Sequence, residues 1–111
     1  MEQIRYDSKE LERLCQDERY AKGKLNVQGM KKLRRRMEDL EAAPTLGELP
    51  NTGRPHPLDR DLADHYAIGL DGGRRLVFKA IDPAPRDQLG RIDWTRVSRI
   101  IITHIEDYHD G

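Results

Sequence analysis

The sequence lacks the features that stabilise secreted scaffolds and anchor membrane proteins. It has a single cysteine, Cys15, so no disulfide can form within the chain. No apolar run approaches the roughly 20 residues that cross a bilayer, and residues 1–5 do not have the pattern of a secretory signal. With aromatic residues at 5% and all hydrophobic residues at 36%, the core must be small. We therefore expect a protein of the reducing cytoplasm that is not bound to a membrane.

Net charge is also absent, because 20 basic side chains balance 20 acidic ones in 111 residues. Charge as a whole therefore argues neither for nor against binding to nucleic acid. Its distribution is uneven. Every charged residue in one segment is basic, namely Arg19, Lys22, Lys24, Lys31, Lys32, Arg34, Arg35 and Arg36. Such a segment is either a surface that meets a polyanion or a solvated helix face, and both interpretations stay open.

Apolar periodicity predicts a single α+β domain over residues 1–111, with its elements in the order β-α-α-β-β-β-β. A short strand at residues 3–6 precedes two helices. Their apolar stripes contain Leu11, Leu14 and Cys15 in the first helix, and Met30, Leu33, Met37 and Leu40 in the second. On this stripe Cys15 is expected to be a small buried hydrophobe. The two helices should cover one face of a largely antiparallel sheet.

The second half of the chain contains most strands of that sheet. Residues 56–58 lie among prolines, which keeps them at a sheet edge. Residues 66–70 and 74–81 form a hairpin around Asp71-Gly72-Gly73. The last strand is apolar on both faces, so we expect it at the centre of the sheet and buried on both sides. Its apolar residues are Ile100, Ile101, Ile102 and Ile105.

The last strand leads into three groups that can move or stabilise protons: Asp107, Tyr108 and His109. A buried strand that ends in ionisable residues is the layout expected of a scaffold that presents chemistry, although strands also end in polar residues where they reach water. No Cys/His pair has zinc-ligand spacing. His104 and His109 are separated by an odd spacing, so a regular strand would point them to opposite faces. Neither a metal nor a cofactor is predicted.

Three segments follow one another in a specific order: His56-Pro57-Leu58, the hairpin of residues 66–78, and Glu106-Asp107-Tyr108-His109. In this order they resemble the HigB-type toxins of the RelE/ParE superfamily, the killer proteins of plasmid-maintenance and other toxin–antitoxin systems. The resemblance implies a small twisted sheet packed on two helices and a ribosome-dependent mRNA endonuclease. It also implies a neutralising antitoxin, HigA-like, with a helix-turn-helix domain. By resemblance, the active-site positions are His56, Arg75, Asp107, Tyr108 and His109.

These residue types suit RNA cleavage, in which the ribose 2′-OH loses a proton to attack the adjacent phosphate and the 5′-oxygen gains one. Histidine, with an unperturbed pKa of about 6.5, can do either near neutral pH, so His56 and His109 are the candidates. Asp107 would orient an imidazole or act as the base itself. Arg75 would stabilise the negative charge on the phosphate, and Tyr108 would stack on a base or hydrogen-bond the phosphate. Which group is acid and which is base stays open.

Binding to RNA or to the ribosome needs a local positive surface. For this surface we predict five residues of the basic helix and one loop residue, namely Lys31, Lys32, Arg34, Arg35, Arg36 and Arg60. The chain departs from the family pattern at Asp59, directly after His-Pro-Leu, where family members commonly have a lysine. Arg60 is the nearest substitute for that positive charge.

Two other functions stay open. A toxin of the same fold can act by binding a protein, as the gyrase inhibitors of the ParE branch do, and then it needs no acid–base residues. A decayed relative or a non-catalytic interaction module would fit the neutral net charge and the reversed charge at Asp59. Growth arrest with intact mRNA would indicate the first, and harmless expression with tight antitoxin binding the second.

Overall fold

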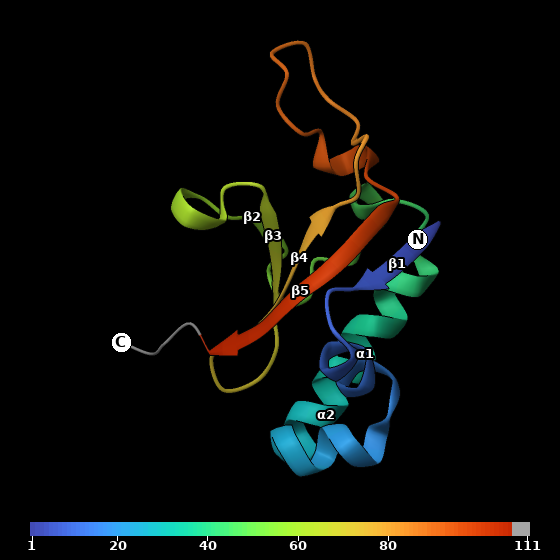
Figure 1. Ribbon diagram of the computed structural model, residues 1–111, viewed down its shortest axis with the longest axis vertical. Helices are drawn as coiled ribbons and strands as arrows, with labels where there is room; N and C mark the ends of the chain where they lie inside the picture. The colour runs from blue at the N-terminus through green and yellow to red at the C-terminus, as the bar shows by residue number, and fades with distance from the viewer. Residues whose placement is uncertain (108–111) are drawn as a thin grey trace.

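The fold is built on one five-stranded sheet with the spatial order β1-β5-β4-β3-β2 (Figure 1). The structure is a computed structural model that describes the backbone of residues 1–107 and the side chains of residues 1–105. The strands are β1 (Gln3–Tyr6), β2 (His56–Pro57), β3 (His65–Gly69), β4 (Arg74–Ala80) and β5 (Arg99–Asp107). The helices, which lie between β1 and β2 in the chain, are α1 (Lys9–Gln16) and α2 (Glu18–Ala42). The predicted α+β class is confirmed.

The β3–β4 hairpin forms where its turn residues predict it. Gly72 and Gly73 have φ values of 58° and 83°, the left-handed conformations that a tight two-residue hairpin turn requires. The Arg74 N–H donates to the Asp71 carbonyl at 2.9 Å and closes the turn. The turn thereby fixes the register of β3 against β4.

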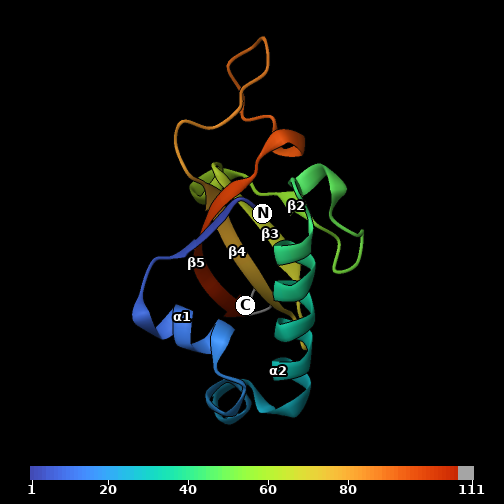
Figure 2. The same cartoon turned by 90° about the vertical axis from the view of Figure 1, so that its right-hand side faces the viewer.

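β5 is an interior strand, parallel to β1 and antiparallel to β4. The prediction that it is buried on both faces is wrong. Ile100 and Ile102 are fully buried, whereas Ile101 between them is partly exposed. The reason is that α2 runs along only one side of the sheet (Figure 2), so alternate residues of β5 face the core and the uncovered side. The middle strand of the five is β4.

A β-bulge changes the direction of the β5 side chains partway along the strand. Ile102 and His104 pair with consecutive residues of β4, so Thr103 is the extra residue. Beyond the bulge, Ile105 packs against the core and His104 faces the uncovered side. If β5 were a regular strand without the bulge, alternation would place His104 on the same face as Ile102.

Polar side chains determine where the helical segments begin. α1 begins after Ser8, whose Oγ accepts a hydrogen bond from the Leu11 N–H at 3.1 Å. α2 is interrupted at Asn26, whose φ is 63°. The Asn26 Oδ1 accepts a hydrogen bond from the Gly29 N–H at 3.0 Å. Asn26 therefore ends the first segment of α2 and caps the second.

The second segment of α2 packs its apolar stripe on one face of the sheet. The most buried residues of the stripe are Leu33, Met37 and Leu40, and those of the sheet are Ile68, Leu76, Phe78, Ile100 and Ile102. Turn η3 (Trp94–Arg96) extends this core, because the centroid of the Trp94 ring lies 4.9 Å from that of the Tyr66 ring. In the part of the chain that the structure describes, no helix is long and apolar enough to span a membrane.

Residues 82–97 connect β4 to β5 and include an arm that extends beyond the sheet (Figure 1). A bridge between Arg86 and Ile92 closes its base. The Asp87 carboxylate accepts hydrogen bonds from the N–H groups of Leu89 and Arg91 at 2.9 and 3.0 Å. The arm is thus shaped by its own hydrogen bonds, and Leu89 near its tip is 75% exposed.

Replacing Phe78 by alanine tests the position of the core. Phe78 is fully buried, so we expect the free energy of unfolding of the Phe78→Ala protein to be lower than that of the wild type by about 3–5 kcal/mol. Leu89→Ala is the matched control, because that side chain contacts mainly water, and its effect should stay within about 0.5 kcal/mol. Urea denaturation of both variants measures the difference. Equal losses in the two variants would contradict this core.

Candidate active site

A pocket at the β2 edge of the sheet brings together two residues predicted to be catalytic. Its volume is about 480 Å³, and it is lined by Gly53, Arg54, His56, Ala67, Gly69 and Arg75. The register places His56 of β2 opposite Ala67, and Arg75 of β4 opposite Gly69. These two β3 residues have small side chains, which leaves space between the flanking strands. His56 is exposed and Arg75 is half-buried.

A backbone carbonyl two residues earlier in the chain holds the His56 ring in one tautomer. The Nδ1 atom of His56 lies 2.7 Å from the Arg54 carbonyl oxygen. A carbonyl oxygen can only accept a hydrogen bond, so Nδ1 is the donor and carries the proton of the neutral ring. The lone pair is then on Nε2. Acid–base chemistry by this imidazole therefore takes place at Nε2.

The loop before β2 turns sharply, which places the Arg54 carbonyl beside His56. Gly53 and Arg54 have φ values of 80° and 50°, and the left-handed conformation costs a residue such as arginine roughly 1–2 kcal/mol. The loop is tied to β3, because the Gly69 N–H donates to the Gly53 carbonyl at 2.7 Å. A Cβ at position 53 would lie 2.7 Å from the Gly69 oxygen and 2.9 Å from Arg36 Nε. Position 53 therefore requires glycine.

The side chain of Arg36 is buried and has a structural role. It is 5% exposed, and its Nε donates to the Gly69 carbonyl at 3.1 Å. Its Nη1 lies 4.0 Å from the Asp39 carboxylate. The sequence suggested Arg36 as an RNA contact because of its charge, but burial removes it from the surface that RNA can reach. Its contacts join α2 to the end of β3 that borders the pocket.

The basic side of α2 approaches the pocket through the loop of residues 50–54. Three exposed basic residues of α2 line a groove whose other wall belongs to this loop. The groove is lined by Lys31, Lys32 and Arg35, with Arg36 and Asp39 at its floor, and by Pro50 and Thr52 opposite. The next two residues of the loop, Gly53 and Arg54, line the pocket. One loop therefore separates the basic groove from the pocket.

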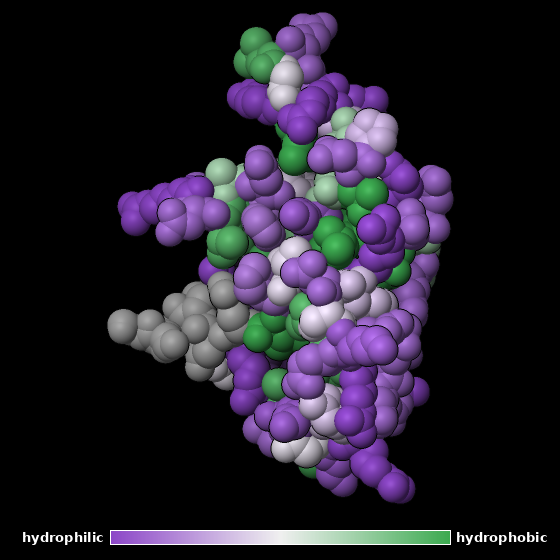
Figure 3. Space-filling model, viewed as in Figure 1, coloured by the Kyte–Doolittle hydropathy of each residue, from purple (hydrophilic) through white to green (hydrophobic). Residues whose placement is uncertain are grey.

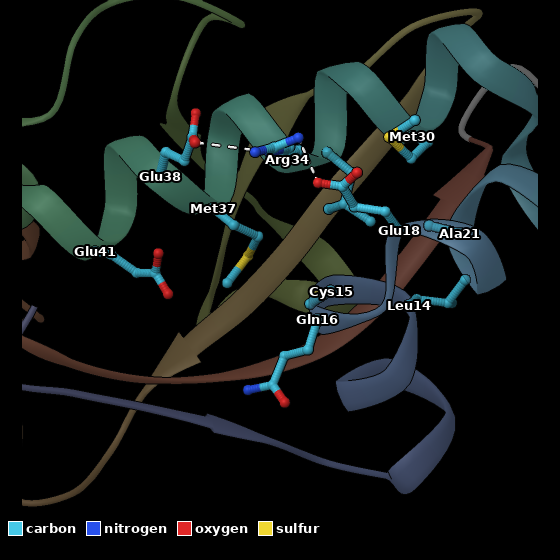
Figure 4. A pocket seen from close by; sticks show the side chains of 11 residues that line it. Leu14, Cys15, Gln16, Glu18, Ala21, Met30, Arg34, Met37, Glu38 and Glu41 are labelled. Atoms are coloured by element: carbon cyan, nitrogen blue, oxygen red, sulfur yellow. Dashed lines mark ion pairs between the residues drawn. The ribbon is translucent and has the colours of Figure 1, made fainter.

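The other two predicted RNA contacts lie elsewhere. Arg34 forms ion pairs with Glu18 and Glu38 at a hollow between α1 and α2 (Figure 4). Two carboxylates therefore offset its charge on a different side of the helix from the groove. Arg60 begins turn η2 (Arg60–Leu62), is exposed, and lines neither the groove nor the pocket.

The hollow between α1 and α2 also contains the single cysteine (Figure 4). Burial raises the pKa of the Cys15 thiol to about 12. The thiol is therefore protonated at neutral pH, and a protonated thiol is a poor nucleophile. Cys15 was predicted to be a small buried hydrophobe, and the structure shows it half-buried.

Sequence reasoning assigned no role to two histidines that lie on the uncovered face of the sheet. The ring centroids of His65 (β3) and His104 (β5) are 5.9 Å apart, and the rings are inclined at 55°. Alternation along β3 from Ala67 is a signal that would have placed His65 on the face of the pocket. The bulge at Thr103 places His104 there, and its sequence signal is the three-residue step from Ile102 to Ile105.

The C-terminal candidates lie at the limit of the described residues. β5 pairs with β4 so that Glu106 is in register with Arg75, and Asp107 with Arg74. The side chains of Glu106 and Asp107 lie outside the described residues, as do Tyr108 and His109 entirely. Their catalytic roles stay predictions. Among the residues that are described, no group of three or more His, Cys, Asp or Glu side chains is placed to hold a metal ion.

No family model and no curated protein matches this sequence, but solved structures match the fold. A YoeB dimer from Staphylococcus aureus has a TM-score of 0.54 at 17% identity, over 94% of this chain and 93% of that one. A YoeB/ParE toxin from Agrobacterium tumefaciens has a TM-score of 0.57 at 10% identity, over 95% of this chain and 97% of that one. A YoeB–YefM complex from Staphylococcus aureus has a TM-score of 0.55 at 18% identity, over 96% and 95%.

The likeness extends over nearly the whole of each chain, so it includes the sheet, the helices and the strands that carry the pocket. At these identities it transfers no residue roles. The chain has the fold of the YoeB/ParE toxins.

Proposed function

We propose that this chain is the toxin of a type II toxin–antitoxin system, of the HigB type, and that it cleaves mRNA on the ribosome. The observation that carries the proposal is that His56 and Arg75, distant in sequence, line one pocket on the uncovered face of the sheet. The fold of the YoeB/ParE toxins supports it separately. In this proposal residues 1–111 form one cytoplasmic toxin domain.

The pocket residues suit cleavage by attack of a ribose 2′-OH on the adjacent phosphate. A base removes the 2′ proton, the 2′-oxygen bonds to phosphorus, and the bond from phosphorus to the 5′-oxygen breaks as an acid protonates that oxygen. His56 takes or gives its proton at Nε2, because Nδ1 is committed to the Arg54 carbonyl. The Arg75 guanidinium, a planar fork of donors, stabilises the charge on the phosphate. No metal ion is needed for this route.

A second proton-transferring group is required, because one imidazole cannot be base and acid in the same step. Asp107, Tyr108 and His109 are our candidates, on the strength of the resemblance to HigB-type toxins. In this scheme His109 complements His56, Asp107 orients an imidazole or acts as base, and Tyr108 stacks on a base or binds the phosphate. The observation beside this resemblance is that the backbone of Glu106, the residue before Asp107, pairs with Arg75.

Two partners follow from the proposal. The ribosome would present the mRNA, and Lys31, Lys32 and Arg35 in the groove beside the pocket loop are the proposed contacts to RNA, with Arg60 as a further one. A cognate antitoxin, HigA-like, would neutralise the toxin. One of the similar solved structures is a complex of YoeB with YefM, which supports an antitoxin partner for this chain.

A second candidate function is inhibition of DNA gyrase by protein binding. The name of the Agrobacterium neighbour, which joins YoeB with ParE, favours it. So does Asp59, whose negative charge close to His56 disfavours a phosphate. A gyrase inhibitor needs no acid–base residue, so the two candidates differ in how they respond to the loss of His56.

Replacing His56 by alanine therefore separates the two functions. Wild-type protein expressed without antitoxin should arrest growth and produce new mRNA ends within translated codons. His56→Ala should reduce cleavage by about 10²–10⁴-fold and restore growth, because no imidazole remains at the pocket to transfer a proton. Mapping of mRNA ends after brief induction measures this.

Leu89→Ala, on the exposed arm, is the control and should cut mRNA as the wild type does. Growth arrest by the wild type with intact mRNA and damaged DNA would contradict the endonuclease and favour the gyrase inhibitor. Undiminished cleavage by His56→Ala would remove His56 from the mechanism.

Arg75 provides a test of the phosphate site. Arg75→Ala should lower the single-turnover rate of cleavage on mRNA-programmed ribosomes by about 10²–10³-fold. Arg75→Lys should recover only part of that rate, because lysine keeps the charge and loses the planar fork. Arg19→Ala removes the same charge from an exposed position on α2 and should leave the rate unchanged. If Arg75→Ala behaved like Arg19→Ala, the phosphate would bind elsewhere.

A further inference from the structure

Among the residues whose side chains the structure describes, the charges on the uncovered face of the sheet are of one sign, and beyond them the register brings one acidic residue, Glu106, opposite Arg75. Strand alternation and the observed registers place twelve positions with described side chains on this face. They are Gln3, Arg5, His56, His65, Ala67, Gly69, Arg75, Val77, Lys79, Arg99, Ile101 and His104. Four of them are arginine or lysine, three are histidine, and none is aspartate or glutamate. A surface of this kind complements a polyanion.

His65 and His104 form a pair on this face, beside the pocket. They extend from β3 and β5, which flank β4, and their rings approach to 5.9 Å between centroids. In the register His65 is opposite Lys79 and His104 is opposite Val77. Both rings are partly exposed. Figure 3 shows mainly hydrophilic side chains on the side seen in Figure 1, with small apolar patches between them.

The His104 ring is held in place by its neighbour Thr103, and the surroundings of His65 lower the pKa of that imidazole. The Nδ1 of His104 lies 2.8 Å from Thr103 Oγ1, whose hydroxyl donates to the Val77 carbonyl at 3.3 Å. Burial lowers the pKa of His65, and the nearby His104 and Lys79 lower it further, whereas Asp64 acts in the opposite direction. The pair therefore offers aromatic surface beside a lysine.

We infer that the His65–His104 pair is a second RNA subsite, which stacks a base of the single strand whose phosphate lies in the His56–Arg75 pocket. The inference rests on the proposed function and adds a binding site to it. Histidine is among the side chains on which splayed-out RNA bases stack.

The subsite is close enough to the pocket to hold the same strand. Ala67 lines the pocket, and His65 is two residues away along β3, on the same face. At about 3.3 Å per residue in a strand, the separation is about 7 Å. Lys79, exposed and opposite His65, is placed to bind a phosphate of that strand. The positive charge of Lys79 also makes the pair a poor place for a metal cation.

Affinity for a short fluorescent 2′-O-methyl RNA, which cannot attack its own phosphate, tests the inference by fluorescence anisotropy. His65→Ala and His104→Ala should each weaken binding about tenfold, because each removes a stacking surface. His104→Phe should bind nearly as the wild type does, since it retains an aromatic ring. Tyr20→Ala, which removes an aromatic ring on α2, is the matched control and should leave the affinity unchanged.

A second measurement tests whether the RNA reaches the pair. The pKa of His65, followed by NMR, should be below its ordinary value in the free protein and should rise when the RNA binds, because the added phosphates favour the imidazolium. The groups that face His65 in the free protein are His104, Lys79 and Asp64, and the RNA changes only the charge around them. A pair that lies away from the bound RNA would show no such change, and the comparison of His104→Phe with His104→Ala separates stacking from a structural role.

Three results would overturn the inference. They are no binding by the wild type, wild-type affinity in both alanine variants, and equal loss in His104→Phe and His104→Ala. The proposed function is judged separately by mRNA cleavage in cells. Cleavage by the wild type with unaltered RNA affinity in His104→Ala would overturn the subsite alone. Loss of affinity in His104→Ala without cleavage by the wild type would overturn the nuclease alone.

Discussion

The packing of α2 against one face of the sheet is the constraint on which the rest of the structure depends. Leu33, Met37 and Leu40 are buried against the strands, and this apolar contact is the main source of stability for a small core. Because both helices precede β2, the later part of the chain, as far as Asp107, contributes strands and short turns, and no α-helix of the described residues covers the other face. That face can hold charges, which would be costly to bury in the core. Its basic residues and imidazoles are therefore compatible with the fold.

The covered face nevertheless determines the geometry of the pocket, through a series of hydrogen bonds. Arg36, anchored in α2, donates to the Gly69 carbonyl, and the Gly69 N–H donates to the Gly53 carbonyl. The carbonyl of the next residue, Arg54, accepts a hydrogen bond from His56 Nδ1. Each partner is a backbone group or a side chain whose position is fixed by packing. The imidazole is thus positioned before any substrate binds, which is the condition for efficient acid–base chemistry. This role explains a buried cation that would otherwise be costly.

Local chemistry made the hairpin, the helices and the edge strand predictable, because glycines, apolar spacing and prolines act within a few residues. His56 and Arg75 were predicted from the resemblance of their segments, and the structure places both at one pocket. Features that depend on tertiary contacts were not predictable. The charge of Arg36 gave no sign that its partner is the backbone of a distant strand. Similarly, regular strand alternation does not predict that His104 faces the uncovered side, because a bulge at Thr103 interrupts it, and the three-residue step from Ile102 to Ile105 is its one sequence signal.

The most direct test of this account is a crystal structure of the protein with a short RNA that has a single 2′-deoxy nucleotide at the site of attack. The account predicts that the RNA lies on the uncovered face, with the phosphate that follows the deoxyribose between His56 Nε2 and the Arg75 guanidinium. RNA bound along α2 or the arm, with the pocket empty, would contradict the claim that this face is the working surface of the protein.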